Sequence, residues 1–416
     1  MFRRVPGTKD ILSGETDYWQ KIEETSRNIF SLYNYKEIRT PLIEDATLFN
    51  RSLGEFSEVI QKQMFLIHHG HDVYALRPEG TASIARAYIE NNLDKKEGFL
   101  KLYYIGPMFR LERPQKGRLR QFHHIGCEAI GSAGPDIDIE VISLASAMLQ
   151  AYQVYGYKIK INSLGCAKDK IELAAILKRR LSGKTNNLCD ECRKRFENNI
   201  LRILDCKNES CRTLVNALHI GDSHLCNDCK LHFNAVKNGL DILGINYEVV
   251  GHLVRGLDYY TRTVFEISHN DLGSQDALCA GGRYDKLVSE LGGPDVGAIG
   301  FAFGVERLLL VANIQVPKDT EKKLTYVITL GEEARPYGLK LLKELRKTGI
   351  PADTDYEGRS LKGAMRVAGD LKARYVVIIG ENELKKKTVM LKDMVSGKQN
   401  EVSEEKVVGE LASLLR

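Results

Sequence analysis

The 416-residue sequence contains no run of about 18 apolar residues, the length that a membrane-spanning helix needs. Its first residues also lack an apolar stretch followed by small residues, as a secretory signal would have. Internal repeats and low-complexity tracts are absent as well. Nine cysteines in a chain of this kind favour reduced thiols or metal ligands over disulfides. We therefore expect a cytoplasmic protein without a membrane partner.

The chain also has only a small excess of positive over negative residues. Charged residues make up 28% of the chain and the formal net charge is +5. Such a balance permits a nucleic-acid partner without requiring one, because phosphate binding depends on where the charge clusters. Hydrophobic residues make up 43%, as in globular proteins with a sizeable core, and the length predicts two or three domains.

Hydrophobic periodicity predicts a mixed α/β (α+β) fold in four parts. Residues 1–165 predict a helix (Glu15–Tyr33), a hairpin and antiparallel strands, and residues 246–318 return to strands that end in a helix near Val305. Between them, residues 166–245 are mostly helical, and the polar stretch 182–244 holds six of the nine cysteines, which is typical of an insertion. After a linker near 317–323, strands and helices alternate over 324–416, which predicts a small α/β domain.

The segment Phe109–Glu128 (FRLERPQKGRLRQFHHIGCE) concentrates basic residues around one acidic residue. Period-two alternation would place Arg110 and Glu112 on one strand face, where they could grip a phosphate or a carboxylate. Glu128 follows in an otherwise apolar strand, where a carboxylate is costly without a partner. The alternative is a solvated hairpin tip without function.

Four further segments carry polar residues beside glycine or a turn. They are LRPEGT (76–81), VRGLDYYT (254–261), CAGGRYD (279–285), whose glycines would let a ligand approach the backbone, and GFAFGVERL (300–308). Each alone also fits a structural explanation, because a single arginine is usually a surface residue and paired tyrosines often pack in a core. Five such segments in one order favour a shared site.

In this order the segments resemble those of class II aminoacyl-tRNA synthetases, and LVRGLDYYTRTVFE and AGGRYD resemble the histidyl-tRNA synthetase family in particular. The similarity runs from VPGTKDIL near the start to the C-terminal domain. It implies an antiparallel sheet core flanked by helices, a helical insertion that clamps the tRNA acceptor arm, a C-terminal anticodon-binding domain and a homodimer with an interface near Pro41. It also implies that histidine and ATP, with Mg²⁺, give histidyl-adenylate, from which histidine passes to tRNA(His).

The resemblance also implies roles for individual residues. Three arginines would be catalytic: Arg110, Arg255 and Arg307. Histidine would contact Glu79, Gly80, Thr81, Arg110, His124, Glu128, Arg255, Tyr259 and Tyr260, with Glu128 and Tyr260 at the imidazole nitrogens and Glu79 and Thr81 at the α-amino group. ATP would contact Arg110, Glu112, Arg118 and Arg307. The acceptor end of the tRNA would contact Arg113, Gln115 and Lys116, which otherwise form a mobile loop.

His124 departs from the family pattern, which usually has glutamine at this position. A neutral imidazole also offers one donor and one acceptor, although with a different reach. We therefore include His124 among the expected histidine contacts while the geometry of that contact stays open.

Two C-x-x-C pairs occur in the helical insertion, Cys189/Cys192 and Cys226/Cys229, with Cys206 and Cys211 between them. Two such pairs can supply the four thiolates of a tetrahedral structural zinc site. The alternative is a set of free cysteines packed in helices.

Two other functions fit parts of the pattern. One is a non-catalytic paralogue that serves as a regulatory subunit of histidine biosynthesis; such paralogues tend to lose the arginines and the C-terminal domain, which are present here. The other is a tRNA-binding module without catalysis, which does not need the expected ATP and histidine residues. Histidine-dependent ATP–pyrophosphate exchange distinguishes all three.

Overall fold

The computed structural model describes residues 2–54, 57–273, 276–315 and 323–415. The chain is divided into two compact units, which comprise residues 1–316 and 317–416. Among the described residues, no helix is long and apolar enough to cross a membrane.

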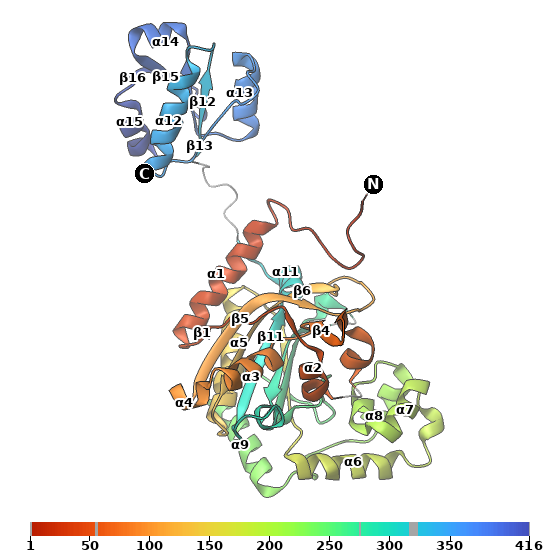
Figure 1. Ribbon diagram of the computed structural model, residues 1–416. Coiled ribbons are helices and arrows are strands. Elements are labelled where there is room, and N and C mark those ends of the chain that lie inside the picture. The colour runs from red at the N-terminus through yellow and green to blue at the C-terminus, as the bar shows by residue number, and fades with distance from the viewer. Residues whose placement is uncertain (1, 55–56, 274–275, 316–322, 416) are drawn as a thin grey trace. The chain divides into compact units, whose positions relative to one another are not determined.

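The first unit is built on an eight-stranded mixed sheet (Figure 1). Its six inner strands pair antiparallel, and each edge strand pairs parallel with its neighbour. In spatial order the strands are β1 (Lys36–Glu37), β5 (Leu100–Phe109), β6 (Gln121–Ile130), β11 (Ala298–Gly304), β10 (Ala277–Arg283), β9 (Thr261–Ser268), β7 (Lys158–Ser163) and β8 (Glu248–Val249).

One face of this sheet is covered by helices that carry an apolar stripe. Side chains such as Phe30, Val141 and Phe233 pack there against Cys127, Ala129 and Phe301 of the strands. The helices are α1 (Thr16–Leu32), α5 (Asp136–Ala151), α9 (Asn227–Ile242) and α11 (Val305–Val311), and the short η4 (Asn270–Leu272) follows β9.

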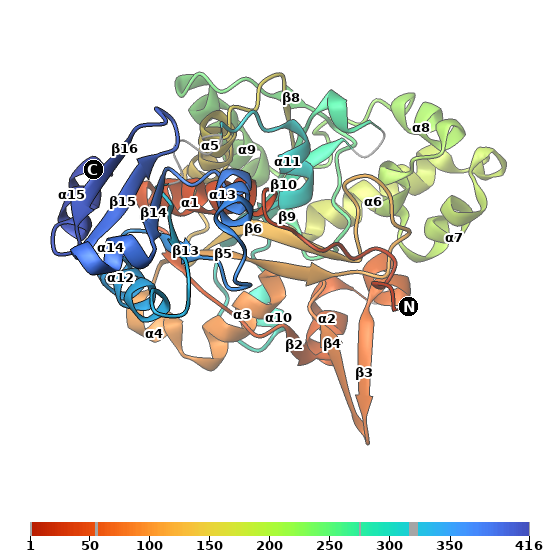
Figure 2. The ribbon, with the colours of Figure 1, turned by 90° about the horizontal axis from the view of Figure 1, so that it is seen from above.

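The other face packs against smaller elements and the insertion. A three-stranded sheet of β2 (Ile43–Asp45), β4 (Asp72–Leu76) and β3 (Phe65–His69) lies here, and the β3–β4 hairpin projects outward (Figure 2). The helices before the insertion are α2 (Ala46–Leu53), the π-helical turn η1 (Val59–Gln63), α3 (Thr81–Glu90) and α4 (Leu93–Glu97); α10 (Leu287–Glu290) comes after it. The insertion forms α6 (Ala167–Leu181), η2 (Thr185–Asn187), α7 (Asp190–Asn198), η3 (Ile200–Asp205) and α8 (Glu209–Asn216) before α9, and α6, α7 and α8 lie together in Figure 1.

The second unit has its own five-stranded sheet, with three parallel strands followed by an antiparallel hairpin. Helices cover both faces, because Leu342 and Val407 belong to one core and Ala364 and Ala368 to the other. Its elements are β12 (Thr325–Thr329), α12 (Arg335–Lys347), β13 (Ala352–Thr354), α13 (Leu361–Asp370), β14 (Tyr375–Ile379), α14 (Glu381–Lys386), β15 (Thr388–Asp393), β16 (Gln399–Ser403) and α15 (Val407–Leu414).

The expected mixed α/β fold, with a largely antiparallel core and a C-terminal α/β unit, is confirmed. Three details differ. The strands expected over 246–318 begin with β8, which has only two residues, and the region also includes β10, whose two glycines weaken the strand pattern in the sequence. Strand β5 ends at Phe109, so Arg110 and Glu112 lie in a loop and not on a strand face. The expected linker falls almost wholly outside the described residues.

Candidate functional site

A cavity of about 260 Å³ opens in the first unit, on the sheet face that carries Glu128. Strands β5, β6, β10 and β11 contribute to its wall, together with the loop after β5 and the loop before β9. Eleven of the expected site residues line it: Glu79, Thr81, Arg110, Glu112, Arg118, His124, Glu128, Arg255, Tyr259, Tyr260 and Arg307. Side chains separated by more than 200 positions in the chain therefore meet in one enclosure.

Glu128 lies at the centre of a buried hydrogen-bond cluster. Its neighbours Cys127 and Ala129 face the opposite core, so alternation along β6 turns the Glu128 carboxyl group toward the cavity. The Thr81 hydroxyl donates to Oε1 at 2.7 Å and the Tyr284 hydroxyl to Oε2 at 2.5 Å. Burial raises the pKa of Glu128 to about 8, although these hydrogen bonds act in the other direction. We call Thr81, Glu128 and Tyr284 the Glu128 cluster.

Glu79 caps the helix that begins at Thr81. Its carboxylate accepts hydrogen bonds from the backbone N–H groups of Thr81, at 2.7 Å, and Ala82, at 2.8 Å. Such a contact satisfies two donors that the first helical turn leaves free. Burial raises the pKa of Glu79, against the effect of these hydrogen bonds. Glu79 thus has a structural partner within the chain in addition to its place at the cavity.

Three arginines gather beside the loop that follows β5, and we call Arg110, Arg118 and Arg307 the arginine cluster. Arg110 Nε donates to the carbonyl of Pro78 at 2.9 Å, and Arg307 Nε donates to that of Gly117 at 2.9 Å. Burial lowers the pKa of Arg307, and the nearby charges of Arg118 and Arg110 lower it further.

Glu112 is the acidic residue beside these arginines. It forms an ion pair with Arg118, and hydrogen bonding to Glu112 raises the pKa of Arg118. Two carboxylates act on Arg307, but Glu112 is paired with Arg118 and Glu266 with Arg255, so Arg110 and Arg307 keep a local positive excess. The arginine cluster is therefore suited to an anion with more than one charge, such as a polyphosphate.

Arg255 enters the cavity from the loop between β8 and β9. Its NH1 group donates to Glu266 at 2.5 Å, whereas its Nε is buried without a hydrogen-bond partner. Tyr259 and Tyr260 lie on the same loop with their rings 4.6 Å apart, and burial raises the pKa of Tyr260 to about 12. Both tyrosines are thus neutral near pH 7, and the Arg255 guanidinium retains a donor for a ligand.

His124 lines the cavity with a buried Nδ1 that has no hydrogen-bond partner. Burial lowers its pKa well below the usual value, and the charges of Arg110, Arg77 and Arg307 add to this effect. The imidazole is therefore neutral and can offer one donor and one acceptor.

Four expected residues lie outside the cavity wall. Gly80 is buried beneath it, where a Cβ atom would come within 2.5 Å of the Tyr104 ring, so this glycine makes room for that side chain. Arg113, Gln115 and Lys116 are exposed on the loop after β5. They are the part of this loop that is open to a macromolecule.

Several cavity residues were not expected from the sequence as ligand contacts. Tyr104, Phe122 and Tyr284 line the wall, as does Glu306, whose carboxylate accepts from the backbone N–H of His123 at 3.0 Å. Tyr104 and Phe122 lie in strands whose apolar pattern gives no polar signal, whereas Tyr284 follows β10 and Glu306 lies in α11. Gly300 leaves room for the Glu128 side chain, since a Cβ atom at this position would lie 1.8 Å from Glu128 Oε2. The glycines of CAGGR have a similar role: a Cβ at Gly281 would meet the carbonyl of Gly300 at 2.5 Å, so they allow strand packing.

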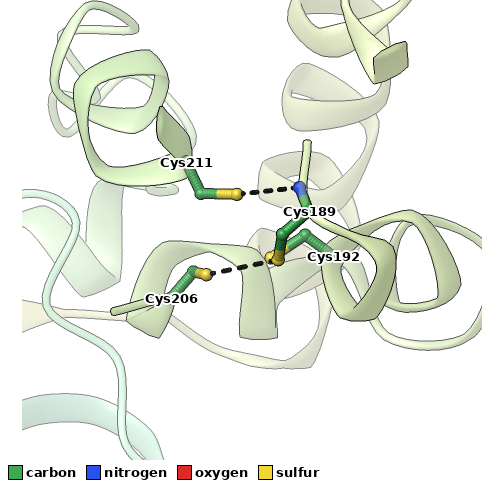
Figure 3. Close-up of side chains that lie close together, drawn as sticks. All are labelled: Cys189, Cys192, Cys206 and Cys211. Carbon is green, nitrogen blue, oxygen red and sulfur yellow. Dashed lines mark hydrogen bonds between the residues drawn. The ribbon is translucent and has the colours of Figure 1, made fainter. Parts of the chain in front are cut away.

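The cysteines of the insertion do not form the expected four-ligand group. Cys189 and Cys192 lie with Cys206 and Cys211 (Figure 3), whereas Cys226 and Cys229 lie with Cys166 and Asp169. The expected zinc ligand set of Cys189, Cys192, Cys226 and Cys229 is thus wrong in its grouping. Spacing showed which cysteines are paired locally, but the helices between the pairs decide which pairs meet.

Comparison with known proteins gives concordant matches over nearly the whole chain. A family model described as histidyl-tRNA synthetase matches residues 7–308, and one described as an anticodon binding domain matches residues 325–414. The histidine–tRNA ligase of Thermotoga petrophila is 45% identical, with 99% of this chain and 98% of the relative covered. That of Desulforamulus reducens is 44% identical, with 96% of each covered. The crystal structure of apo S. aureus histidyl-tRNA synthetase superposes with a TM-score of 0.79 at 34% identity, covering 99% of this chain and 100% of that one.

Proposed function

Because the chain belongs to the histidyl-tRNA synthetase family, we propose that it is a histidine–tRNA ligase that joins histidine to tRNA(His) through histidyl-adenylate. The observation that carries this proposal is the single cavity that holds both a buried carboxyl group suited to an imidazole and an arginine cluster suited to polyphosphate. A ligase of this kind needs both ligands side by side.

In the first step the carboxylate of histidine attacks the α-phosphorus of ATP, a new C–O–P bond forms, and pyrophosphate leaves with the electron pair of the broken P–O bond. No proton has to move, so alignment and neutralisation of negative charge are the main requirements. Arg110 would hold the α-phosphate, and Arg307 would steady the nucleotide. Arg118 would reach the distal phosphates, and Glu112 the adenine edge. Arg255, with its unpartnered Nε, would bind the α-phosphate and the histidine carboxylate from the opposite side.

Glu112 and Glu306 would hold Mg²⁺, which would neutralise part of the negative charge of the phosphates. The cavity fits this role, since the carboxylates of Glu112 and Glu306 line it and oxygen is the ligand atom that Mg²⁺ prefers.

Histidine would be recognised by groups on both sides of its ring. Glu128 and Tyr260 would meet the two imidazole nitrogens, with His124 and Tyr259 beside them. The α-amino group would lie near Glu79, Gly80 and Thr81. Because the Glu128 carboxyl group is buried and already accepts from Thr81 and Tyr284, an amino acid whose side chain cannot hydrogen-bond to it would be strongly disfavoured.

Transfer to tRNA would involve other parts of the chain. We assign residues 1–165 and 246–318 to the catalytic core, 166–245 to an insertion that contacts the acceptor arm, and 324–416 to anticodon binding. The exposed Arg113, Gln115 and Lys116 would contact the acceptor end. The active form would be a cytoplasmic homodimer.

Histidine-dependent ATP–pyrophosphate exchange by the purified protein with Mg²⁺ tests this function. We expect exchange that requires histidine, and an Arg255→Ala variant that folds but has lost exchange by about 10³-fold. The exposed Arg179→Ala on α6 is the matched control and should behave as the wild type. Absence of exchange in the wild type would contradict the enzyme function and favour the regulatory-subunit alternative, which the full-length ligase relatives support less. Near-normal exchange in Arg255→Ala would refute the role of Arg255 alone.

A further inference from the structure

Four cysteines of the insertion converge on one point (Figure 3). Cys189 and Cys192 come from the start of α7, Cys206 follows η3, and Cys211 lies in α8. Their sulfur atoms all lie within 4.8 Å of one another. All four are free thiols, and Cys192 and Cys211 are completely buried. We call these residues the four-cysteine cluster.

The spacing of the sulfur atoms matches a tetrahedral metal site. A Zn–S bond is about 2.3 Å, so the edge of a tetrahedral ZnS₄ unit is about 3.8 Å. The Cys189 and Cys206 sulfur atoms are 3.8 Å apart, which is far longer than a disulfide bond of about 2.0 Å.

Two sulfur atoms of the cluster, those of Cys189 and Cys211, lie where backbone N–H groups can stabilise negative charge. Cys189 is the N-cap of α7, where the free N–H groups and the helix dipole stabilise negative charge. The backbone N–H of Cys189 also donates to the Cys211 sulfur atom at 3.2 Å. Zinc binds the thiolate form, so these contacts would strengthen metal binding.

The helices that carry the cluster are short. Helices α7 and α8 have nine and eight residues, and helices this short are marginal on their own. Their apolar side chains, such as Cys192 and Val215, join the core that also holds Leu173 and Leu177 of α6. A metal ion bound by the cluster would add a direct link between α7, η3 and α8.

From these observations we infer that Cys189, Cys192, Cys206 and Cys211 bind one structural Zn²⁺, which fixes η3 against the loop that carries Arg255. Between Cys192 and Cys206 lie Asn199 and Arg202. Asn199 Nδ2 donates to the Asp258 carboxylate at 3.2 Å, and Arg202 NH1 donates to the carbonyl of Arg255 at 3.0 Å. Two of the proposed ligands therefore flank the segment that holds this loop.

The second group, Cys166, Asp169, Cys226 and Cys229, provides a matched comparison within the insertion. Its carboxylate is already engaged in capping two helices, because Asp169 accepts from the backbone N–H of Cys166 at 3.2 Å and from that of Cys226 at 3.0 Å. Cys226 is also exposed. Serine at position 226 is therefore a suitable control for serine in the four-cysteine cluster.

Metal analysis of the full-length protein tests the site independently of catalysis. We expect one equivalent of zinc bound by this cluster, so that Cys192→Ser and Cys211→Ser each contain about one equivalent less zinc than the wild type. Cys226→Ser should match the wild type, and Cys211→His should retain the metal, because histidine can replace one thiolate. After chelation, Co²⁺ added to the wild type should give the intense visible bands of a tetrahedral thiolate site.

Hydrogen exchange measures the effect on the loop. In the Cys192→Ser variant, amides of residues 254–260 should exchange faster than in Cys226→Ser, with circular dichroism confirming that both chains fold. A wild type that contains no zinc and gives no thiolate-type Co²⁺ spectrum would overturn the site, as would iron in place of zinc or undiminished zinc in Cys192→Ser. Should the serine variants fail to fold, the Co²⁺ titration of the wild type still decides.

Discussion

The Glu128 cluster and the arginine cluster line one cavity but differ in charge: one centres on a buried carboxyl group, and the other on positively charged guanidinium groups. In the Glu128 cluster the carboxyl group has two hydroxyl donors within the chain, and burial favours its neutral form. In the arginine cluster, Arg307 lies close to Arg110 and Arg118, and the nearby carboxylates of Glu112 and Glu266 are already paired with Arg118 and Arg255. The Glu128 cluster therefore has its hydrogen bonds without a ligand, whereas the arginine cluster retains an excess of positive charge.

This difference indicates how each side would select its ligand. The Glu128 cluster can reject wrong amino acids, because any ligand must offer groups good enough to compete with the hydrogen bonds already made. The arginine cluster gains from any polyphosphate that offsets its repulsion, so it would contribute charge neutralisation and less discrimination.

The largest expected effect follows from removing a charge on the arginine side. Arg307→Ala should lower the rate of pyrophosphate exchange by about 10³-fold, because a preorganised positive charge facing the phosphates is lost. Histidine binding, measured by calorimetry without ATP, should change little. The exposed Arg179→Ala is the control and should exchange at the wild-type rate. An exchange rate of Arg307→Ala within a few-fold of the wild type would argue against the division between the clusters.

The next effect concerns stability and pH in the absence of ligands. The pKa of Glu128 is raised to about 8 in the folded chain, from about 4.5 when unfolded, so the folded state holds this proton more tightly. The resulting stabilisation is complete below pH ~4.5 and is lost as the pH rises to about 8. Relative to Glu128→Gln, the wild type should therefore lose on the order of 3 kcal/mol between pH 5 and pH 8.

Urea unfolding of both chains at the two pH values measures this loss. The exposed Glu172→Gln on α6 serves as the surface control and should show no such divergence. A constant difference in unfolding free energy between the wild type and Glu128→Gln would mean that burial does not hold the carboxyl group neutral.

A third effect separates the two ligands kinetically. Glu128→Gln should raise the KM for histidine by about 100-fold, because the NH2 group that replaces one carboxyl oxygen cannot accept a hydrogen bond, so one of the donors from Thr81, Tyr284 and the imidazole N–H loses its acceptor. The KM for ATP should remain within a few-fold of the wild type. Equal changes in both constants would show that the clusters do not act separately.

The smallest effect is expected for the loop after β5. Arg118→Ala should raise the KM for ATP by about 10-fold, because Arg118 is partly exposed and its charge is screened more than that of Arg307. Lys116 lies outside the cavity and is exposed. Lys116→Ala should therefore leave exchange unchanged and slow the transfer of histidine to tRNA. Impaired exchange in Lys116→Ala would place the loop tip at the nucleotide.

Local sequence was a good guide wherever periodicity was strong. Helix α1, Thr16–Leu32, lies within one residue of the expected Glu15–Tyr33 at each end, and the hairpin expected within residues 1–165 is that of β3 and β4. Strand β10 was missed because Gly281 and Gly282 obscure its pattern, and these glycines are needed only once β9 and β11 pack on either side. A residue whose role is to leave space for a distant neighbour carries no local signal.

By itself, the sequence determined the fold class and most of the elements, because periodicity is a property of neighbouring residues, and its resemblance to a known family pointed to eleven of the residues that line the cavity. Only the tertiary structure decided that Glu128 meets Thr81 and Tyr284, that Arg255 pairs with Glu266, and which cysteines converge. These contacts join residues brought together by strand order and by the path of the insertion. Burial then sets their chemistry, since the same carboxyl group or thiol behaves differently once water is excluded.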